Sequence, residues 1–312
     1  MRDHKINVLQ NGVGGKGSKT NKSKRKGFGY QILGFGSGGA GASPAVVNWL
    51  VVAGGGASML SPGIPSSGGG GGAGAYRAYA YGPSPLQGSS QELDPGDFTI
   101  TVGGGGASSP GLDDTAAQGS NSVFAGATTI TSAGGGHGGG GPAPIATAGD
   151  GGSGGGGSGY GAYNGGSGNT PPVSPPQGNN GGRGGGYNPW GGGGGGGMGG
   201  SGTTVPTSHN QAGGAGGAGV PNTITGSDVT YAAGGHGQPG GPNSDGANNT
   251  GNGADAGPQS AANSGRPGIV VVRFPADAAG FVSAAPGTNT VSTLGPGEVV
   301  AKFTVSGTLT LG

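Results

Sequence analysis

The sequence predicts an all-β protein with very little helix, in which a small β core carries a polyglycine II-type bundle of glycine-rich excursions. Glycine and proline account for 89 and 23 of the 312 residues, and both residue types destabilise helices. No window of the chain has apolar residues at helical spacing. Short β-branched and apolar segments bounded by Gly, Pro, Asn or Asp recur instead, which is typical of antiparallel strands joined by turns.

The predicted strands are short and spread along the chain. They comprise residues 46–53, 97–103, 121–124, 127–132, 222–225, 228–232, 268–274 and 299–311. Two of these regions form an internal repeat, because residues 121–138 align with residues 221–237 when Gly126 is placed on Gly226. Each copy is expected to be a hairpin that turns at this glycine and continues into a glycine tract with one histidine.

The longest glycine-rich region, residues 134–268, contains 52 of the 89 glycines. One interpretation is a flexible linker, because such a composition buries too little apolar surface to fold. The other is a bundle of extended polyglycine II segments with three residues per turn. Ala212, Ala215 and Ala218 recur at every third residue, which favours the ordered bundle. Polar interruptions such as residues 171–180 are then expected to be turns at the bundle ends.

Four aromatic residues, Tyr160, Tyr163, Tyr187 and Trp190, lie inside the glycine-rich excursions with little apolar company. They either pack along the edge of the bundle or project as contact residues, since Tyr and Trp combine a large apolar surface with one polar group. His209 lies in another interruption of the glycine tracts. These five residues are the candidates for contact with a binding partner.

Catalytic and metal-binding patterns are missing from the sequence. The chain has no cysteine, and His137, His209 and His236 have no cluster of carboxylates beside them. No lysine follows a glycine tract after residue 27, as a phosphate-binding loop would require. An enzyme is therefore not expected, nor is a cofactor or a metal. No apolar run reaches the ~18–20 residues of a membrane helix, so membrane insertion is not expected either.

The N-terminal region is basic, since residues 1–27 contain eight of the 13 basic residues and one acidic residue. Residues 27–39 then alternate aromatic and aliphatic side chains with glycine, a pattern that suits docking into a groove or adding a strand to a partner. Nucleic acid is not the expected partner, because no aromatic residue interleaves the basic run to stack on bases. The docking candidates are Lys24, Arg25, Lys26, Phe28, Tyr30, Ile32, Leu33 and Phe35.

Four stretches together resemble a known family. They are WLVVAGGG (49–56), GNTPPVSPPQGNNGG (168–182), ITGSDVTYAAGGHG (224–237) and PGIVVVRFPA (267–276). In this order they resemble the glycine-rich proteins of tailed bacteriophages, especially phages of marine bacteria and cyanobacteria. The resemblance covers residues 45–277 and implies a virion structural protein, commonly a tail fibre or adhesin. Related adhesins stack polyglycine II helices whose loops contact the host receptor.

The expected organisation has three parts: a basic arm and virion-docking segment (1–44), a glycine-rich domain (45–277) and a C-terminal β-strand segment (278–312). The resemblance implies a non-enzymatic virion protein, assembled in the host cytoplasm. Its arm would dock on other virion proteins, and its body would bind a host-surface protein or saccharide. Fibrous virion proteins are usually homotrimers, so a homotrimer is expected. A purely structural role, as a head fibre or capsid decoration protein, stays open because both roles need an anchor and an ordered body.

Overall fold

A computed structural model describes residues 41–59, 67–108, 116–141, 147–186, 190–207, 212–239, 247–257 and 263–312. The chain divides into two compact units, Met1–Gly41 and Ala42–Gly312. The predicted docking residues between Lys24 and Phe35 belong to the first unit and lie outside the described residues. The second unit contains all the strands among the described residues.

This unit is all-β, as predicted. The helical content of its described residues is one short 3₁₀ helix, Ala276–Ala278. The strands are β1 (Ala45–Val52), β2 (Tyr76–Tyr79), β3 (Gln91–Leu93), β4 (Gly96–Thr101), β5 (Ser122–Ala125), β6 (Thr129–Ser132), β7 (Val220–Asn222), β8 (Val229–Tyr231), β9 (Ile269–Phe274), β10 (Val282–Ala285), β11 (Thr290–Thr293), β12 (Val299–Phe303) and β13 (Gly307–Leu311).

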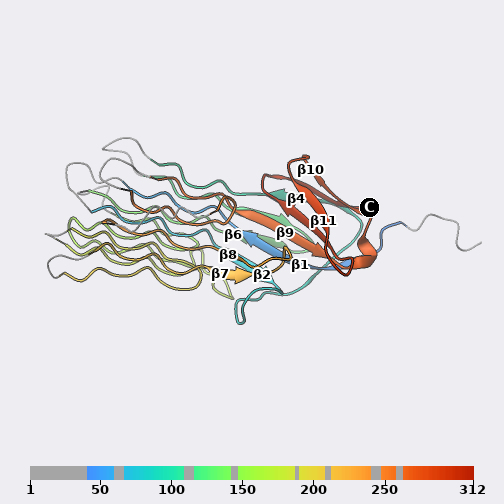
Figure 1. Cartoon of the computed structure of the whole chain (residues 1–312), viewed down its shortest axis with the longest axis horizontal. Coiled ribbons are helices and arrows are strands. Elements are labelled where there is room, and N and C mark those ends of the chain that lie inside the picture. The colour runs from blue at the N-terminus through green and yellow to red at the C-terminus, as the bar shows by residue number, and fades with distance from the viewer. Residues whose placement is uncertain are drawn as a thin grey trace, which may run out of the picture. The chain divides into compact units, whose positions relative to one another are not determined.

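The strands form two antiparallel sheets and a two-stranded ribbon (Figure 1). The six-stranded sheet has the order β11-β12-β9-β1-β2, and β3 also pairs with β1. The five-stranded sheet has the order β10-β13-β4-β5-β6, and β7 pairs with β8 in the ribbon. At the centre of the larger sheet, Trp49 of β1 lies opposite Val272 of β9. Two strands far apart in sequence therefore form the middle of this sheet.

Both faces of the central strands are buried. Trp49 and Val51 face the five-stranded sheet, where Phe124 and Leu309 complete one apolar core. Alternate residues such as Leu50 belong to a second core on the opposite face, which the β7–β8 ribbon covers. Burying a large apolar side chain contributes about 1.5–3 kcal/mol. This double burial accounts for the almost continuous apolar sequences of β1 and β9.

The internal repeat folds as two hairpins, β5–β6 and β7–β8. Gly226 lies in the second turn with a φ of 88°, a conformation that glycine adopts without strain. The first hairpin extends the five-stranded sheet, whereas the second covers the opposite face of the larger sheet. The strand predicted at 222–225 begins earlier, at Val220, and Ile224 lies in the turn.

The strand predicted over residues 299–311 was wrong as a single element, because it is two strands in different sheets. β12 pairs with β9, whereas β13 pairs with β4. The residues between them form a bend, which lets the chain cross from one sheet to the other. The strands β2, β3, β10 and β11 were not predicted. The first three have few β-branched residues, whereas β11 (TVST) is only four residues long and fully exposed, with no buried apolar face.

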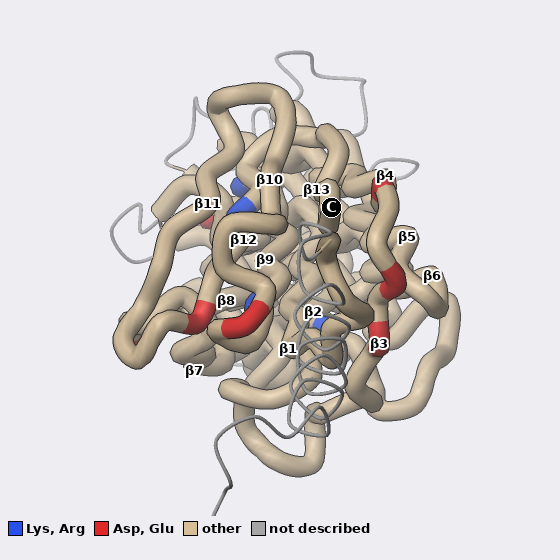
Figure 2. Tube along the Cα trace, turned by 90° about the vertical axis from the view of Figure 1, so that its right-hand side faces the viewer, with Lys and Arg blue, Asp and Glu red and all other residues tan. Residues whose placement is uncertain are grey.

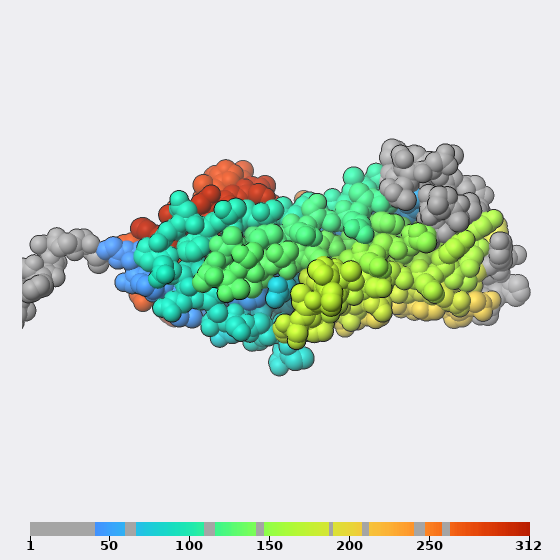
Figure 3. Space-filling view, turned by 180° about the vertical axis from the view of Figure 1, so that it is seen from behind, coloured from blue at the N-terminus to red at the C-terminus, as the bar shows by residue number. Residues whose placement is uncertain are grey.

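Glycine-rich segments run side by side away from the strands (Figure 1). Figure 3 shows the described residues between positions 116 and 239, coloured green to yellow, packed against one another on one face of this unit. In segment 67–75, successive amides donate hydrogen bonds to three different neighbouring segments in turn. Gly69, Gly72 and Ala75 donate to Gly139, Gly136 and Ala133; Gly70 and Ala73 donate to Gly193 and Gly196; Gly71 and Gly74 donate to Ala254 and Gly251.

Segment 53–58 repeats this period of three, with its amides directed in turn to segments 67–75, 116–121 and 263–268. A period of three is what a chain with three residues per turn produces. The glycine segments are therefore an ordered, bonded bundle and not a flexible linker. The left-handed sense of polyglycine II stays a prediction.

Close approach between segments explains the need for glycine. A Cβ atom at Gly71 would overlap the carbonyl group of Gly56, and one at Gly195 would overlap the carbonyl group of Gly71. Side chains are therefore excluded from these interior positions. Figure 2 shows that charged residues are few and scattered at the strand end of the unit.

Candidate functional site

The glycine segments reach a common end away from the strands. Segment 153–159 runs antiparallel to segment 67–75. The amide of Ser153 donates to the carbonyl oxygen of Ala73 near β2, and the amide of Gly159 donates to the carbonyl oxygen of Ser67 at the end farthest from β2. We call this far end, built from Ser67, Gly141, residues 158–163 and Trp190, the distal end.

A tight turn at residues 158–163 presents two tyrosines at the distal end. The amide of Tyr163 donates to the carbonyl oxygen of Ser158 across the turn, at 3.1 Å. The hydroxyl of Ser158 accepts from the amide of Tyr160 at 3.2 Å and donates to the carbonyl oxygen of Gly141 at 3.2 Å. Sequence analysis did not select Ser158, although serine hydroxyls commonly stabilise turns in this way.

Three of the five predicted contact residues come together here. The ring centroids of Tyr160 and Trp190 lie 6.4 Å apart with the planes tilted by 47°, within the range of favourable aromatic pairs. The carbonyl oxygen of Tyr163 accepts from the amide of Gly184. All three side chains are half-buried. Each ring therefore packs against the bundle and also presents part of its surface.

The indole nitrogen of Trp190 is buried and has no hydrogen-bond partner within the described part of the chain. Tyr187 and His209, the other two predicted contact residues, lie outside the described residues. Tyr187 directly follows Gly186, and His209 lies two residues after Thr207 in the sequence.

The two histidines of the internal repeat, His137 and His236, form contacts within the bundle. Nδ1 of His137 lies 3.1 Å from the carbonyl oxygen of Gly138. The amide of His236 donates to Oδ1 of Asp255 at 2.7 Å, and Asp255 is buried in the bundle. Among the described residues, no group of three His, Asp or Glu side chains is placed to hold a metal ion.

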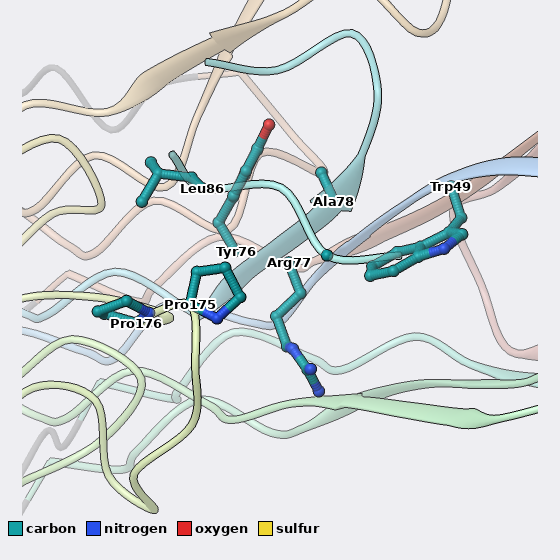
Figure 4. Close-up of a pocket in the computed structure, with 8 residues that line it drawn as sticks. Trp49, Tyr76, Arg77, Ala78, Leu86, Pro175 and Pro176 are labelled. Atoms are coloured by element: carbon teal, nitrogen blue, oxygen red, sulfur yellow. The ribbon is translucent and has the colours of Figure 1, made fainter. Parts of the chain in front are cut away.

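A small depression lies beside β2, and its lining includes Arg77, Pro175 and Pro176 (Figure 4). Figure 4 shows the side chain of Arg77 pointing away from β2 on the side opposite to Tyr76. Burial lowers the pKa of Arg77, and its Nη1 donates to the carbonyl oxygen of Thr131 at 3.3 Å. The cavity is about 10 Å³, room for no more than about one water molecule. It is a packing contact of the proline-rich turn.

The two sheets, the bonded glycine bundle and its aromatic distal end define a glycine-rich β protein. A family model described as a glycine-rich domain matches residues 42–275, and the chain belongs to this family. No curated protein and no solved structure matches the chain. A helix with the length and apolarity to cross a membrane does not occur in the part of the chain that the structure describes.

Proposed function

We propose that this chain is a non-enzymatic structural protein of a bacteriophage virion, a tail fibre or adhesin that contributes to recognition of the host surface. The observation that carries the proposal is the distal end, where a rigid bundle presents Tyr160, Tyr163 and Trp190. Loops on a rigid scaffold commonly carry binding residues. Tyrosine and tryptophan supply contact area at a low entropic cost.

The remaining parts follow from the same proposal. The basic arm, residues 1–44, docks on other virion proteins, and three copies associate as a homotrimer. The receptor is a protein or saccharide of the host cell surface. The resemblance of residues 45–277 to glycine-rich proteins of tailed phages supports this assignment, as does the hydrogen bonding of the bundle in three directions, which makes it a stiff support.

Replacing Tyr163, Tyr187 and Trp190 together by Ser tests the proposal in assembled virions. We expect adsorption to host cells to fall at least about tenfold, while the free energy of unfolding of the purified chain changes by no more than about 1–2 kcal/mol. The matched control replaces Val46, Val291 and Val305 by Ser. These are exposed apolar residues at the strand end, and their replacement should leave adsorption unchanged.

Two outcomes would contradict the proposal. Normal adsorption by a folded triple variant would support the alternative role as a head fibre or decoration protein. Loss of folding would show that the three rings stabilise the bundle edge and are not primarily contact residues.

A further inference from the structure

A cleft of about 240 Å³ lies on the outer face of the six-stranded sheet, beside the β7–β8 ribbon. One wall is formed by Val229 and Tyr231 of β8, and a second by the turn at residues 247–250. The base includes Lys302 of β12 and Ile269, the first residue of β9. Figure 2 shows the labels of β8, β9 and β12 close together on the same side of the unit. This cleft is separate from the distal end.

Hydrogen bonds hold the walls of the cleft in place. Nδ2 of Asn249 donates to the carbonyl oxygens of Gly268, at 2.9 Å, and Thr304, at 3.1 Å. The amide of Ala232 donates to the carbonyl oxygen of Thr250 at 2.9 Å. These bonds tie the turn to β8, β9 and the end of β12. The cleft is therefore formed before any ligand arrives, as binding sites for small molecules usually are.

The cleft carries a positive charge on an acidic body. Residues 28–312 contain 11 acidic and five basic side chains, yet none of the described residues that line the cleft is acidic. Lys302 is half-buried, and no described residue accepts a hydrogen bond or forms an ion pair with its ammonium group. A tyrosine hydroxyl is already neutral near pH 7, and burial raises the pKa of Tyr231 further, to about 12, so Tyr231 does not offset the charge of Lys302.

We propose that this cleft binds a small sugar acid, with its carboxylate on Lys302 and its hydroxyl groups on Thr225, Asn248 and Thr304. Hydrogen bonds between an ammonium and a carboxylate are stronger than those between neutral groups. Threonine hydroxyls and the asparagine amide both donate and accept, as sugar hydroxyls require. Val229, which is partly exposed, offers apolar surface to the C–H groups of the ring. The proposal does not depend on the one made for the distal end.

The size of the cleft limits the ligand to about one ring, because sites for drug-sized ligands measure roughly 300–1,000 Å³. A single uronic acid, such as galacturonate, is therefore the appropriate probe. Glucose has a similar ring without the carboxylate, and acetate has the carboxylate without the ring. Comparing the three separates the contributions of charge and of ring contacts.

The experiment titrates the isotope-labelled full chain with each probe and follows backbone amide signals by NMR. We expect galacturonate to bind at least about tenfold more tightly than glucose or acetate, with shifts centred on Thr225, Asn249 and Lys302. Lys302→Met should weaken galacturonate binding at least about tenfold, as loss of a charged hydrogen bond predicts. Lys302→Arg should retain most of the affinity. Arg183→Met removes the same charge elsewhere and should have no effect.

Other results would overturn the proposal. Equal affinity for glucose would exclude a role for the charge, and equal affinity for acetate would indicate a site for simple anions. Sedimentation that shows self-association lost in Lys302→Met would indicate that a second copy of the chain covers the cleft. Where Lys302→Met does not fold, the wild-type titration decides, since an absence of shifts at Thr225 and Asn249 would exclude this cleft.

Discussion

Replacing Gly71 by Ala adds one methyl group to the middle of the glycine bundle. Gly71 is buried, and its amide donates to the carbonyl oxygen of Ala254 while its own carbonyl oxygen accepts from Gly235. The new Cβ atom would lie 2.8 Å from the carbonyl carbon of Gly56 and 2.9 Å from the amide nitrogen of Ala254, and closer still to the carbonyl oxygen of Gly56. Unstrained contacts between carbon atoms are about 3.5–4.0 Å. The carbonyl carbon of Gly56 would therefore have to retreat by at least about 0.7 Å, and its carbonyl oxygen by more.

This displacement sets the expected loss of stability. Overpacking a well-packed interior costs about 1–3 kcal/mol, and a backbone hydrogen bond weakened by the retreat costs about 1 kcal/mol more. Alanine also restricts the unfolded chain, which offsets about 0.4–1 kcal/mol. The net expectation for Gly71→Ala is a loss of about 1–3 kcal/mol in the free energy of unfolding, a large part of the ~5–15 kcal/mol that stabilises a typical domain.

Gly104→Ala provides the matched control, because a Cβ atom at Gly104 meets nothing within 4 Å. This variant should be as stable as the parent or more stable by up to about 1 kcal/mol. Urea unfolding followed by tryptophan fluorescence measures both, since Trp49 lies in the core with 1% of its surface exposed. Equal stability of the two variants would refute close packing of the bundle around Gly71.

Two further predictions concern the ion pair between Arg273 and Glu298 and the N-terminal arm. The hydrogen bond from Arg273 lowers the pKa of Glu298 below its ordinary value of 4.5, so this pair stabilises the fold above that value and its contribution is lost as pH falls through the lowered pKa. Glu298→Gln should therefore show a smaller drop in stability by urea unfolding between about pH 6 and pH 3, and an unchanged drop would contradict the role of this carboxylate. Deleting residues 1–39 should leave the melting temperature of the body unchanged, because Ala42–Gly312 forms a separate unit, while virions should lack the truncated chain. Normal incorporation would show that the arm does not anchor it.

The fold class could be predicted from the sequence because each residue type sets a local preference for helix or strand. Gly and Pro, with 89 and 23 of 312 residues, disfavour helix along most of the chain, and the β-branched segments at β1 and β9 have few alternatives to strand. The hairpin turn at Gly226 was also predictable, because glycine adopts a positive φ without strain and Gly226 has a positive φ in this turn. The division of residues 299–311 between two sheets was not, because the sequence TVSG between Thr304 and Gly307 contains no strong signal for a crossing.

The candidate site was predictable in part for a similar reason. An aromatic residue cannot occupy the interior of a glycine bundle, so Tyr160 and Tyr163 had to lie where the tract is interrupted, and the structure places a turn there. The pairing of Tyr160 with Trp190 depends on which segments lie side by side. The cleft around Lys302 was not predictable, since its walls come from separate strands and a turn.

The sequence by itself determined that the chain is β-rich, that its long tracts have backbones free to approach closely, and that its basic residues are concentrated in the first 27 positions. These properties follow from single residues and their near neighbours. Only the tertiary structure decided that the amides of Gly69, Gly70 and Gly71 donate to three different segments, and that Lys302 lines a cleft with no acidic side chain among its described lining residues. The physical reason is that every glycine segment offers the same donors and acceptors, so the choice among neighbours depends on how the strands at the base position each segment.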